Sequence, residues 1–363
     1  MFSNIFQNKK VLITGHTGFK GSWASIWLHH LGAKVIGVSD EVKTIPSNYE
    51  LTNLKSFIKD YRINLTDFKK LNQIINENSP DFIFHFAAQA IVSKSFDKPL
   101  ETYKTNTLGT VNMLEAIRLY KGDIITIFIT SDKVYENVEW IWGYREIDQL
   151  GGKDPYSSSK AMAELAINSY FRTFLKYKNF KVAVGRAGNV IGGGDWSETR
   201  IIPDCIKAWS QNKKVKIKNL NSTRPWQFVL EPISGYFSLA QKLYLSELKS
   251  GEAFNFGPVS DNNFTVEELV IEFKKNWKNV NYEASNDKIK ISKEAVLLKL
   301  NCDKALNDLK WKPSLNFKET VKMTADWYQE HYINKNEDMF NVTLKQIIDY
   351  SRRAKNKGLE WTN

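Results

Sequence analysis

The chain has 363 residues, of which 42% are hydrophobic and 25% charged, and this composition excludes global disorder. The 51 basic and 40 acidic residues give a formal net charge of +11, but the lysines are spread along the chain, so we expect no nucleic-acid partner. No apolar run of 18 residues could span a bilayer, and residues 1–10 lack a signal-peptide pattern, so we expect a cytoplasmic protein without membrane association.

The first half of the chain alternates short β-branched runs with longer helical patterns, which is the rhythm of a parallel sheet covered by helices on both faces. Six strands are predicted, at residues 10–14, 34–39, 57–63, 81–87, 124–131 and 181–187. Helical spacing predicts helices at 19–31 and 100–120, and Gly32 is a typical C-cap for the first. Together these elements predict an α/β fold with a Rossmann-like, doubly wound parallel sheet.

After residue 187 this rhythm ends at three consecutive glycines, Gly192, Gly193 and Gly194. The remaining patterns predict helices at 202–211, 232–248, 266–277 and 317–332, a short strand at 215–218, and a polar hinge at 334–338 before a final helix. We therefore predict two interleaved domains. The sheet domain covers 1–190, with segments returning near 225–260, and a smaller, mixed α/β substrate lobe covers 191–363.

A GxxGxxG spacing, formed by Gly15, Gly18 and Gly21, follows the first predicted strand directly. Glycines permit a tight turn and a close approach of the backbone to a pyrophosphate, and the helix N-terminus supplies N–H donors. Such a motif also fits a plain turn, but its position after the first strand is what a dinucleotide site requires. Ser39 stands where an acid usually binds the adenosine ribose. Asp40 either takes that role, which favours NAD over NADP, or only caps the following loop.

Ser131, Asp132 and Lys133 follow the fifth predicted strand, at the sheet edge where open α/β folds place their sites. Tyr156 comes 25 residues after Ser131, and Lys160 follows it at i+4, on the same face of a predicted helix. An ammonium beside a phenol lowers the phenol pKa from about 10 towards the working range of a base. This pair alone fits a surface contact, but together with Ser131 and the glycine motif it favours a catalytic site.

Longer blocks carry a more specific resemblance. They are GHTGFKGSW at 15–23, HFAAQ at 85–89, TSDKVYEN at 130–137, WGYR at 142–145, LGGKDPYSSSK at 150–160, RAGNVIGGGDW at 186–196, IPDC at 202–205 and RPWQFVLEP at 224–232. From about residue 9 to residue 332 the chain resembles the extended short-chain dehydrogenase/reductases, and within them the CDP-glucose 4,6-dehydratases. The tract 301–313 resembles the usual end of extended members.

The resemblance implies a homodimeric or larger NAD-dependent lyase of deoxysugar and polysaccharide biosynthesis. Hydride leaves sugar C4, water is lost across C5 and C6, and the hydride returns to C6. It makes Tyr156 the base for the C4 hydroxyl, Lys160 its pKa-lowering and ribose-binding partner, and Ser131 a donor to the C4 oxygen. Asp132 would protonate the departing C6 hydroxyl. Lys133 replaces the glutamate that removes the C5 proton in dTDP-glucose dehydratases, and acts either as that base or as an electrostatic helper.

The resemblance also implies two sets of binding residues. NAD would be bound by Gly15, Thr17, Gly18, Phe19, Lys20, Gly21, Asp40, Asn64, Leu65, Ala87, Ala88, Gln89, Asn106, Thr130, Tyr156 and Lys160. The nucleotide sugar would be bound by Gln89, Ser131, Asn189, Arg200 and Arg224. Asn64 replaces an acid that would hold the adenine amino group, so we expect weak NAD binding. No metal is expected, because Cys205 and Cys302 lie outside any ligand spacing.

Two alternatives stay open. The same fold could dehydrate or epimerise another sugar, linked to GDP or UDP, or the chain could bind a nucleotide without turnover. A 4-epimerase needs only Tyr156 and the cofactor, so Asp132 and Lys133 favour elimination. A protein without turnover would not need Ser131, Tyr156 and Lys160 together.

Overall fold

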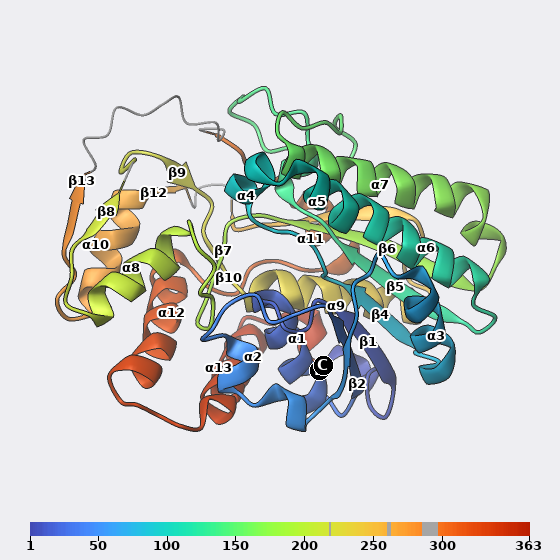
Figure 1. Cartoon of the computed structure of the whole chain (residues 1–363), viewed down its shortest axis with the longest axis horizontal. Helices are drawn as coiled ribbons and strands as arrows, with labels where there is room; N and C mark the ends of the chain where they lie inside the picture. The colour runs from blue at the N-terminus through green and yellow to red at the C-terminus, as the bar shows by residue number, and fades with distance from the viewer. Residues whose placement is uncertain (218, 260–262, 285–296) are drawn as a thin grey trace.

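The computed structural model of the protein describes residues 1–217, 219–259, 263–284 and 297–363. Its centre is a seven-stranded sheet in the order β11-β6-β5-β4-β1-β2-β3, with all neighbouring strands parallel (Figure 1). The strands are β1 (Lys10–Thr14), β2 (Lys34–Ser39), β3 (Lys59–Arg62), β4 (Phe82–His85), β5 (Ile124–Ile129), β6 (Phe180–Ala187) and β11 (Glu252–Phe256). The predicted doubly wound, Rossmann-like α/β fold is confirmed.

The helices vary widely in length. They are α1 (Phe19–His30), α2 (Asn48–Leu51), α3 (Phe68–Asn78), α4 (Val92–Asp97), α5 (Pro99–Tyr103), α6 (Gly109–Leu119), α7 (Pro155–Thr173), α8 (Ile201–Ser210), α9 (Leu230–Tyr244), α10 (Val266–Asn276), α11 (Asp303–Leu309), α12 (Phe317–Tyr332) and α13 (Met339–Asn356). In the described part of the chain, no helix combines the length and the hydropathy that crossing a bilayer requires.

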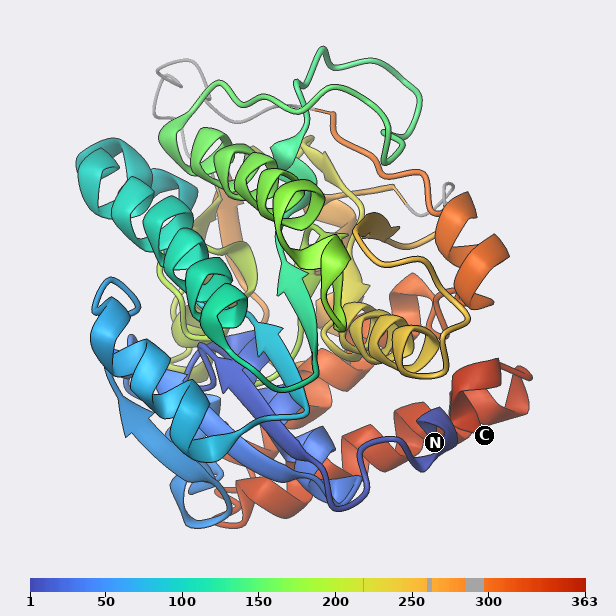
Figure 2. The same ribbon diagram turned by 90° about the vertical axis from the view of Figure 1, so that its right-hand side faces the viewer.

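Alternating side chains of the central strands enter two apolar cores. In β1, Val11 and Ile13 belong to the core shared with α1, α9 and α13, whereas Leu12 belongs to the core shared with α3, α6 and α7. A strand that is buried on both faces needs an unbroken apolar run, and β5 has all six residues buried. Figure 2 shows α6 and α7 side by side on one face of the molecule. The carboxyl ends of the strands meet at one edge.

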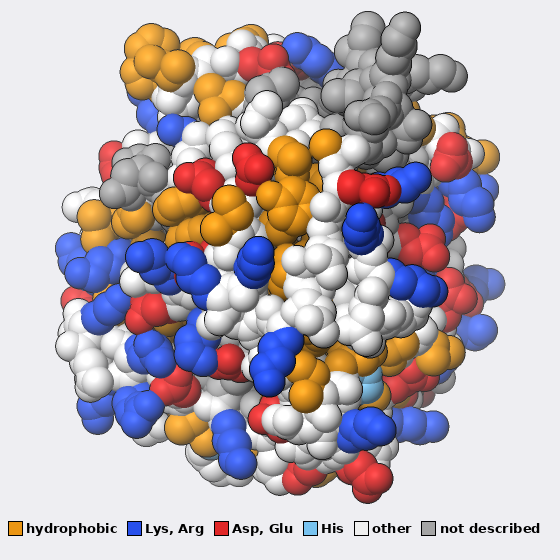
Figure 3. Space-filling view, turned by 90° about the vertical axis from the view of Figure 1, so that its left-hand side faces the viewer, with side chains coloured by type: hydrophobic (Ala, Val, Ile, Leu, Met, Phe, Trp, Pro, Cys, Tyr) orange, Lys and Arg blue, Asp and Glu red, His pale blue; other side chains and the backbone are white. Residues whose placement is uncertain are grey.

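The second lobe, on the left in Figure 1, is built from short strands and helices. The strand pairs are β7 (Val190–Ile191) with β10 (Gln227–Phe228), β9 (Thr223–Arg224) with β12 (Phe264–Thr265), and β8 (Val215–Ile217) with β13 (Tyr282–Ala284). On this face basic side chains are interspersed with acidic ones rather than gathered in one stripe (Figure 3). Strand β11 and helix α9 pack with the main sheet, and α13 packs against α1. The domain boundary at residue 190 stays a prediction.

Several predicted boundaries need correction. The third strand does not reach Phe57, because residues Leu54–Ser56 form a 3₁₀ helix that ends there. The predicted strands at 81–87 and 124–131 end earlier, at His85 and Ile129. The helix predicted at 100–120 is α5 and α6 joined by a π-helical segment. The helix predicted at 232–248 begins and ends earlier, as α9.

All six predicted strands are present in the sheet, but its seventh strand, β11, was missed. This strand lies at the sheet edge, and its first two residues, Glu252 and Ala253, are half-buried, so its sequence lacks the apolar run of the inner strands. The short strand predicted at 215–218 is β8, although residue 218 lies outside the described residues. The final helix predicted after the polar segment is α13.

Candidate active site

The glycine turn after β1 has the geometry of a dinucleotide cradle. Gly15 has a φ of +75°, which favours glycine, and a Cβ there would lie 2.8 Å from the backbone nitrogen of Ala87. A Cβ at Gly21 would lie 2.1 Å from the Gly15 carbonyl oxygen, so α1 packs directly on the turn. In the described structure no side chain caps the N-terminus of α1 after Gly18, which leaves N–H donors for an anion. These residues fit the pyrophosphate of NAD.

The residues predicted at the adenosine end make local contacts. The Asp40 carboxylate accepts the Glu41 N–H at 2.8 Å and the Lys43 ammonium at 3.0 Å, which is the loop-capping role that the sequence left open. The Asn64 side-chain oxygen accepts the backbone N–H and the hydroxyl of Thr66, at 2.9 and 2.7 Å. Leu65 is buried. The side chains of Asp40 and Asn64 therefore stabilise their own loops.

A polar cluster around His16 was not predicted. The His16 ring lies under β2, where a Cβ at Gly37 would be 2.5 Å from it, and its Nε2 lies 2.9 Å from Asp60 Oδ1. Tyr49 and Arg62 donate to the other carboxylate oxygen of Asp60. Burial alone would raise the pKa of Asp60, but the hydrogen bonds from His16 and Tyr49 outweigh it and hold that pKa well below its usual range. No motif signalled this cluster, because it joins separate elements.

Ser131 and Tyr156 come together at the carboxyl end of β5. Asp154 caps α7 by accepting the Ser157 N–H at 2.9 Å, and this fixes Tyr156 in the first turn of the helix. Burial raises the pKa of Tyr156 to about 12, although a hydrogen bond with Ser131 and the charge of Arg200 oppose that shift. Within the protein the shift is thus opposite to the direction predicted for the tyrosine–lysine pair.

Lys160 lies one turn further along α7 and is buried. Its ammonium donates to the Ile129 carbonyl at 3.3 Å, so it contacts the last residue of β5. Burial lowers the pKa of Lys160 to about 8, against the charge of Glu164. Thr130 is also buried here and donates to Glu164 at 2.5 Å.

Asp132 is buried and adjoins a cavity. Ser131 Oγ donates to Asp132 Oδ1 at 2.9 Å and accepts the Lys133 N–H at 3.3 Å. Lys133 itself is half-buried. The Asp132 carboxylate lies against Gly188, where a Cβ would be 1.9 Å from Oδ2. The carboxylate thus contacts Ser131 and also lines the cavity.

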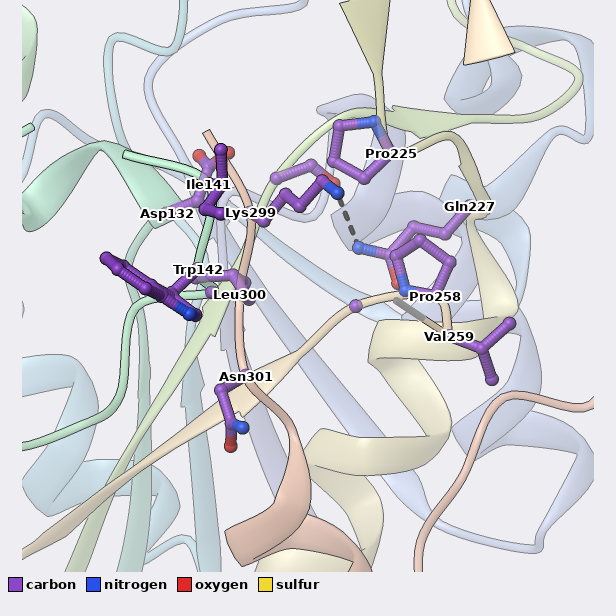
Figure 4. A pocket seen from close by; sticks show the side chains of 13 residues that line it. Asp132, Ile141, Trp142, Pro225, Gln227, Pro258, Val259, Lys299, Leu300 and Asn301 are labelled. Carbon is purple, nitrogen blue, oxygen red and sulfur yellow. Dashed lines mark hydrogen bonds between the residues drawn. The ribbon is translucent and has the colours of Figure 1, made fainter. Parts of the chain in front are cut away.

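The cavity beside Asp132 has a volume of about 220 Å³ (Figure 4). Its other lining residues are Ile141, Trp142, Gly143, Gly188, Pro225, Gln227, Gly257, Pro258, Val259, Lys299, Leu300 and Asn301. Sequence reasoning missed Lys299 and Gln227 as site residues. Trp142 lies in a block that resembles the family, but Lys299 lies in no motif, and only the tertiary fold brings it here.

The cations Lys20, Lys160 and Arg200 lie close enough to one another for their charges to interact. Burial lowers the pKa of Lys20 to about 7, with the charges of Lys160 and Arg200 acting in the same direction and that of Asp132 against it. Arg200, the residue before α8, donates to Asp195 at 2.8 Å. The structure thus brings these predicted residues together, and an excess of cations suits the phosphates of a nucleotide sugar.

Gln89 and Asn106 fasten the loop after β4. Asn106 accepts the Gln89 N–H at 2.7 Å and donates to Ser159 at 2.8 Å. The Gln89 amide donates to Thr102 and to the Ile91 carbonyl, both at 3.0 Å. These side chains therefore tie the loop, which includes the predicted residues Ala87 and Ala88, to α5 and α7.

The two other predicted substrate residues lie in the second lobe. Asn189 precedes β7 with a φ of +38°, and its carbonyl accepts the Gln227 N–H at 3.2 Å. Arg224 lies in β9 and donates to the Thr223 carbonyl at 2.8 Å. Both are half-buried, and the next residues after Arg224 lead into the cavity lining through Pro225.

Comparisons with known proteins agree with this geometry. Residues 12–324 match the model of a family described as GDP-mannose 4,6 dehydratase. The chain is 42% identical over 354 residues to the CDP-glucose 4,6-dehydratase of Salmonella typhimurium, a match covering 96% of this chain and 97% of the relative. It is 27% identical over 345 residues to the human dTDP-D-glucose 4,6-dehydratase, covering 90% and 91%.

Solved structures share the fold. A dTDP-glucose 4,6-dehydratase from Bacillus anthracis in complex with NAD has a TM-score of 0.72 at 24% identity, with 92% of this chain and 99% of that chain covered. A UDP-glucose 4-epimerase from Thermotoga maritima with UDP-glucose has a TM-score of 0.74 at 24% identity, covering 89% and 99%. The fold and the site define an extended short-chain dehydrogenase/reductase. Within that class the chain belongs to the nucleotide-sugar 4,6-dehydratase family that the matched model describes.

Proposed function

We propose that this protein is an NAD-dependent hydro-lyase that converts CDP-D-glucose to CDP-4-keto-6-deoxy-D-glucose, in deoxysugar and polysaccharide biosynthesis. The observation that carries the dehydration is the buried Asp132 carboxylate, hydrogen-bonded to Ser131 and facing the cavity. A 4-epimerase needs Tyr156 but has no use for this additional acid. The CDP-glucose assignment is supported by the 42% identical Salmonella relative.

The glycine turn of Gly15, Gly18 and Gly21 would bind the NAD pyrophosphate, together with the N-terminus of α1. Thr17, Phe19 and Lys20 lie in the same segment. When bound, NAD accepts a hydride from sugar C4 and returns it to C6. Lys160 would bind the ribose of the nicotinamide half, as the family resemblance implies.

Tyr156 would take the proton of the C4 hydroxyl, while Ser131 donates a hydrogen bond to the C4 oxygen. A ketone at C4 makes the C5 hydrogen acidic. Lys133, as a neutral amine, would remove the C5 proton. As an ammonium it would only stabilise the enolate, and the Asp132 carboxylate would then have to take the C5 proton before passing it to the C6 hydroxyl. Asp132 would give its proton to the C6 hydroxyl, which then leaves as water.

The nucleotide sugar would bind through its diphosphate to Arg200 and Arg224, since guanidinium groups pair with phosphate oxygens. Lys20, which the resemblance assigns to NAD, lies close enough to Arg200 for their charges to interact, so its ammonium would contact this diphosphate as well. Asn189 and Gln89 would add hydrogen bonds to the sugar or the diphosphate. The cavity beside Asp132 supports this placement, because it adjoins both the catalytic acid and Pro225, the neighbour of Arg224.

We also infer that the enzyme works as a homodimer or larger homo-oligomer in the cytoplasm, where NAD and nucleotide sugars are available. Helices α5 to α7 and their connecting segment carry exposed apolar side chains. Leu100 is 66% exposed, Leu165 is 58% exposed, and Leu108 and Met162 are more than 40% exposed. Pairing these helices with those of a second copy would bury them.

The proposed reaction is tested by turnover of CDP-glucose in deuterated water. The product should carry solvent deuterium at C5, and label placed at C4 should reappear at C6. In Lys133→Ala, loss of C5 exchange would assign the base role to Lys133. Release of only the C4 epimer, or reduced cofactor accumulating in proportion to product, would contradict the dehydratase. If only a GDP- or UDP-sugar gives this label pattern, the CDP assignment is wrong but the dehydratase stands.

A further inference from the structure

A buried ion pair lies directly behind the catalytic residues. Glu164 is on α7, one turn beyond Lys160 and two turns beyond Tyr156, and only 1% of its surface is exposed. Arg186 is near the end of β6 and is 2% exposed. The Arg186 Nε donates to both carboxylate oxygens of Glu164, at 2.9 and 3.0 Å, and Nη2 also contacts Oε2. The pair thus joins the helix of the catalytic base to the central sheet.

The Glu164 carboxylate also contacts the catalytic strand end. It accepts the hydroxyl of Thr130 at 2.5 Å, and Thr130 directly precedes Ser131. One carboxylate therefore links the helix that carries Tyr156 and Lys160 to the strand that delivers Ser131, Asp132 and Lys133. A shift of this carboxylate would move the two catalytic segments relative to each other.

Arg186 contacts the other end of the same catalytic segment. Its Nη1 donates to the Tyr135 hydroxyl at 2.7 Å, and its guanidinium lies 4.9 Å from the centre of the Tyr135 ring. The Tyr135 hydroxyl in turn donates to Asn255 at 2.7 Å. Nη1 also donates to the Glu146 carbonyl at 3.1 Å, in the loop that carries Trp142 over the cavity. Residues 131–135 are therefore held at Thr130 by Glu164 and at Tyr135 by Arg186.

The stability of the fold does not by itself explain why a buried ion pair lies at this position. Removing two charges from water costs free energy that their attraction often only offsets, so well-packed apolar residues frequently serve as well. An ion pair does, however, impose directional contacts, and here these reach both segments that must act on one sugar. Buried, fully bonded networks hold their members in one geometry.

Glu164 also acts on the charge of Lys160. Burial lowers the pKa of Lys160 to about 8, and the Glu164 charge opposes that shift. The other groups facing Lys160 are Lys20, from α1, and His85, from β4. Lys20 repels the ammonium when charged, whereas burial lowers the pKa of His85 to about 3, so His85 is neutral. Glu164 is therefore the group that favours the ammonium form of Lys160.

We propose that Glu164 and Arg186 are positioning residues for the dehydration, which align Tyr156 and Lys160 with Ser131 and Asp132. This inference rests on the proposed function. Among the described residues that line the cavity, neither Glu164 nor Arg186 occurs, so their effect is exerted through the residues they hold.

The test compares Glu164→Gln with Glu231→Gln. Glu231 is an equally buried carboxylate on α9, which accepts N–H groups of Ser314 and Leu315 and the Tyr350 hydroxyl, away from the catalytic residues. With CDP-glucose, Glu164→Gln should lower kcat at least about tenfold with little change in KM, and move the alkaline limb of the kcat profile down by about one pH unit. Glu231→Gln should keep the wild-type profile, whatever its melting temperature.

A second measurement does not require turnover. Protein with ¹³C-labelled lysine is titrated by NMR from pH 6 to 10, with Lys160→Met to assign the Lys160 signal, because this side chain is buried and its shift reports its titration midpoint without a reagent. This midpoint should fall in Glu164→Gln and stay unchanged in Glu231→Gln. If the wild type turns over CDP-glucose, a Glu164→Gln variant with the wild-type Lys160 midpoint and the wild-type kcat would overturn the proposal. If the wild type is inert to nucleotide sugars, the proposed function fails, and the midpoint alone decides the role of Glu164.

Glu164→Asp keeps the charge but withdraws the carboxylate by one methylene group, so it separates position from charge. It should lower kcat while leaving the Lys160 midpoint near that of the wild type. It also carries the test if Glu164→Gln does not fold. Wild-type kcat in Glu164→Asp would refute the positioning role.

Discussion

The Ser131 hydroxyl donates a hydrogen bond to the Asp132 carboxylate at 2.9 Å, and the pair lies beside the buried phenol of Tyr156. Ser131 and Tyr156 are suited to the oxidation at C4, whereas Asp132 is suited to the loss of the C6 hydroxyl. Because Ser131 and Asp132 are adjacent in the chain, one strand end would supply groups for both halves of the proposed reaction.

Asp132→Asn separates the two halves. The amide keeps the shape and can accept the Ser131 hydrogen bond, but it has no proton to give to the C6 hydroxyl. Elimination should slow by about 10² or more, while substrate affinity and oxidation at C4 change little. Calorimetric titration and turnover are measured on the same preparation. Unchanged turnover would remove Asp132 from the mechanism.

The cofactor should be NAD, bound weakly. The Asp40 carboxylate is engaged by Glu41 and Lys43, and the Asn64 oxygen by Thr66, so neither is free to bind the adenosine at full strength. Family members with acids at the Ser39 and Asn64 positions can make hydrogen bonds to the adenosine that this protein lacks. Each missing hydrogen bond should weaken NAD binding by about 1 to 3 kcal/mol. Titration of the apo protein with NAD and NADP tests this. Tighter binding of NADP would contradict it.

Stability should depend on pH through Glu231. Burial raises the pKa of this carboxyl to about 7, against hydrogen bonds from Ser314, Leu315 and Tyr350. A carboxyl whose pKa is higher in the folded state stabilises the fold below the unfolded pKa, near 4.5, and that contribution is lost as pH rises towards 7. From this group, the free energy of unfolding should fall by about 3 kcal/mol across that window.

Urea unfolding of the wild type and of Glu231→Gln, from pH 4.5 to 8, isolates this contribution, because the amide does not titrate. As pH rises, the free energy of unfolding of the wild type should fall relative to that of Glu231→Gln. If the difference in the free energy of unfolding does not vary with pH, Glu231 has an ordinary pKa. If the wild type gains stability relative to the variant as pH rises, the pKa of Glu231 is lowered in the folded state.

Local patterns predicted much of this molecule. Every residue of β5 except Thr126 is apolar, because the strand is buried on both faces. The glycine turn follows the first strand and Tyr156 lies in the first turn of α7, and the local sequence indicates both positions. The remaining features depend on contacts between distant segments. Strand β11 is recognisable only from its pairing with β6, and Lys299 only from the cavity it lines. The raised pKa of Tyr156 comes from burial, which spacing does not encode.

Lys20 should make nucleotide binding depend on pH. Burial, with the charges of Lys160 and Arg200, lowers its pKa to about 7, so much of it is neutral in the free protein above that pH. A phosphate binds the ammonium form and raises its pKa again. The affinity for CDP should therefore fall by up to about tenfold per pH unit above pH 7, with uptake of a proton on binding.

Calorimetry of CDP binding between pH 6.5 and 9, in two buffers of different ionisation enthalpy, measures both the affinity and the proton uptake. Lys20→Met should bind CDP weakly and lose the pH dependence. Lys160 has a pKa of about 8 and titrates nearby, so Lys160→Met is the necessary control. In Lys160→Met the affinity for CDP should still depend on pH, but with a midpoint at higher pH, because one charge that lowers the pKa of Lys20 is gone. If the dependence instead disappears in Lys160→Met and persists in Lys20→Met, the titrating group is Lys160, and Lys20 has no part in binding the phosphates.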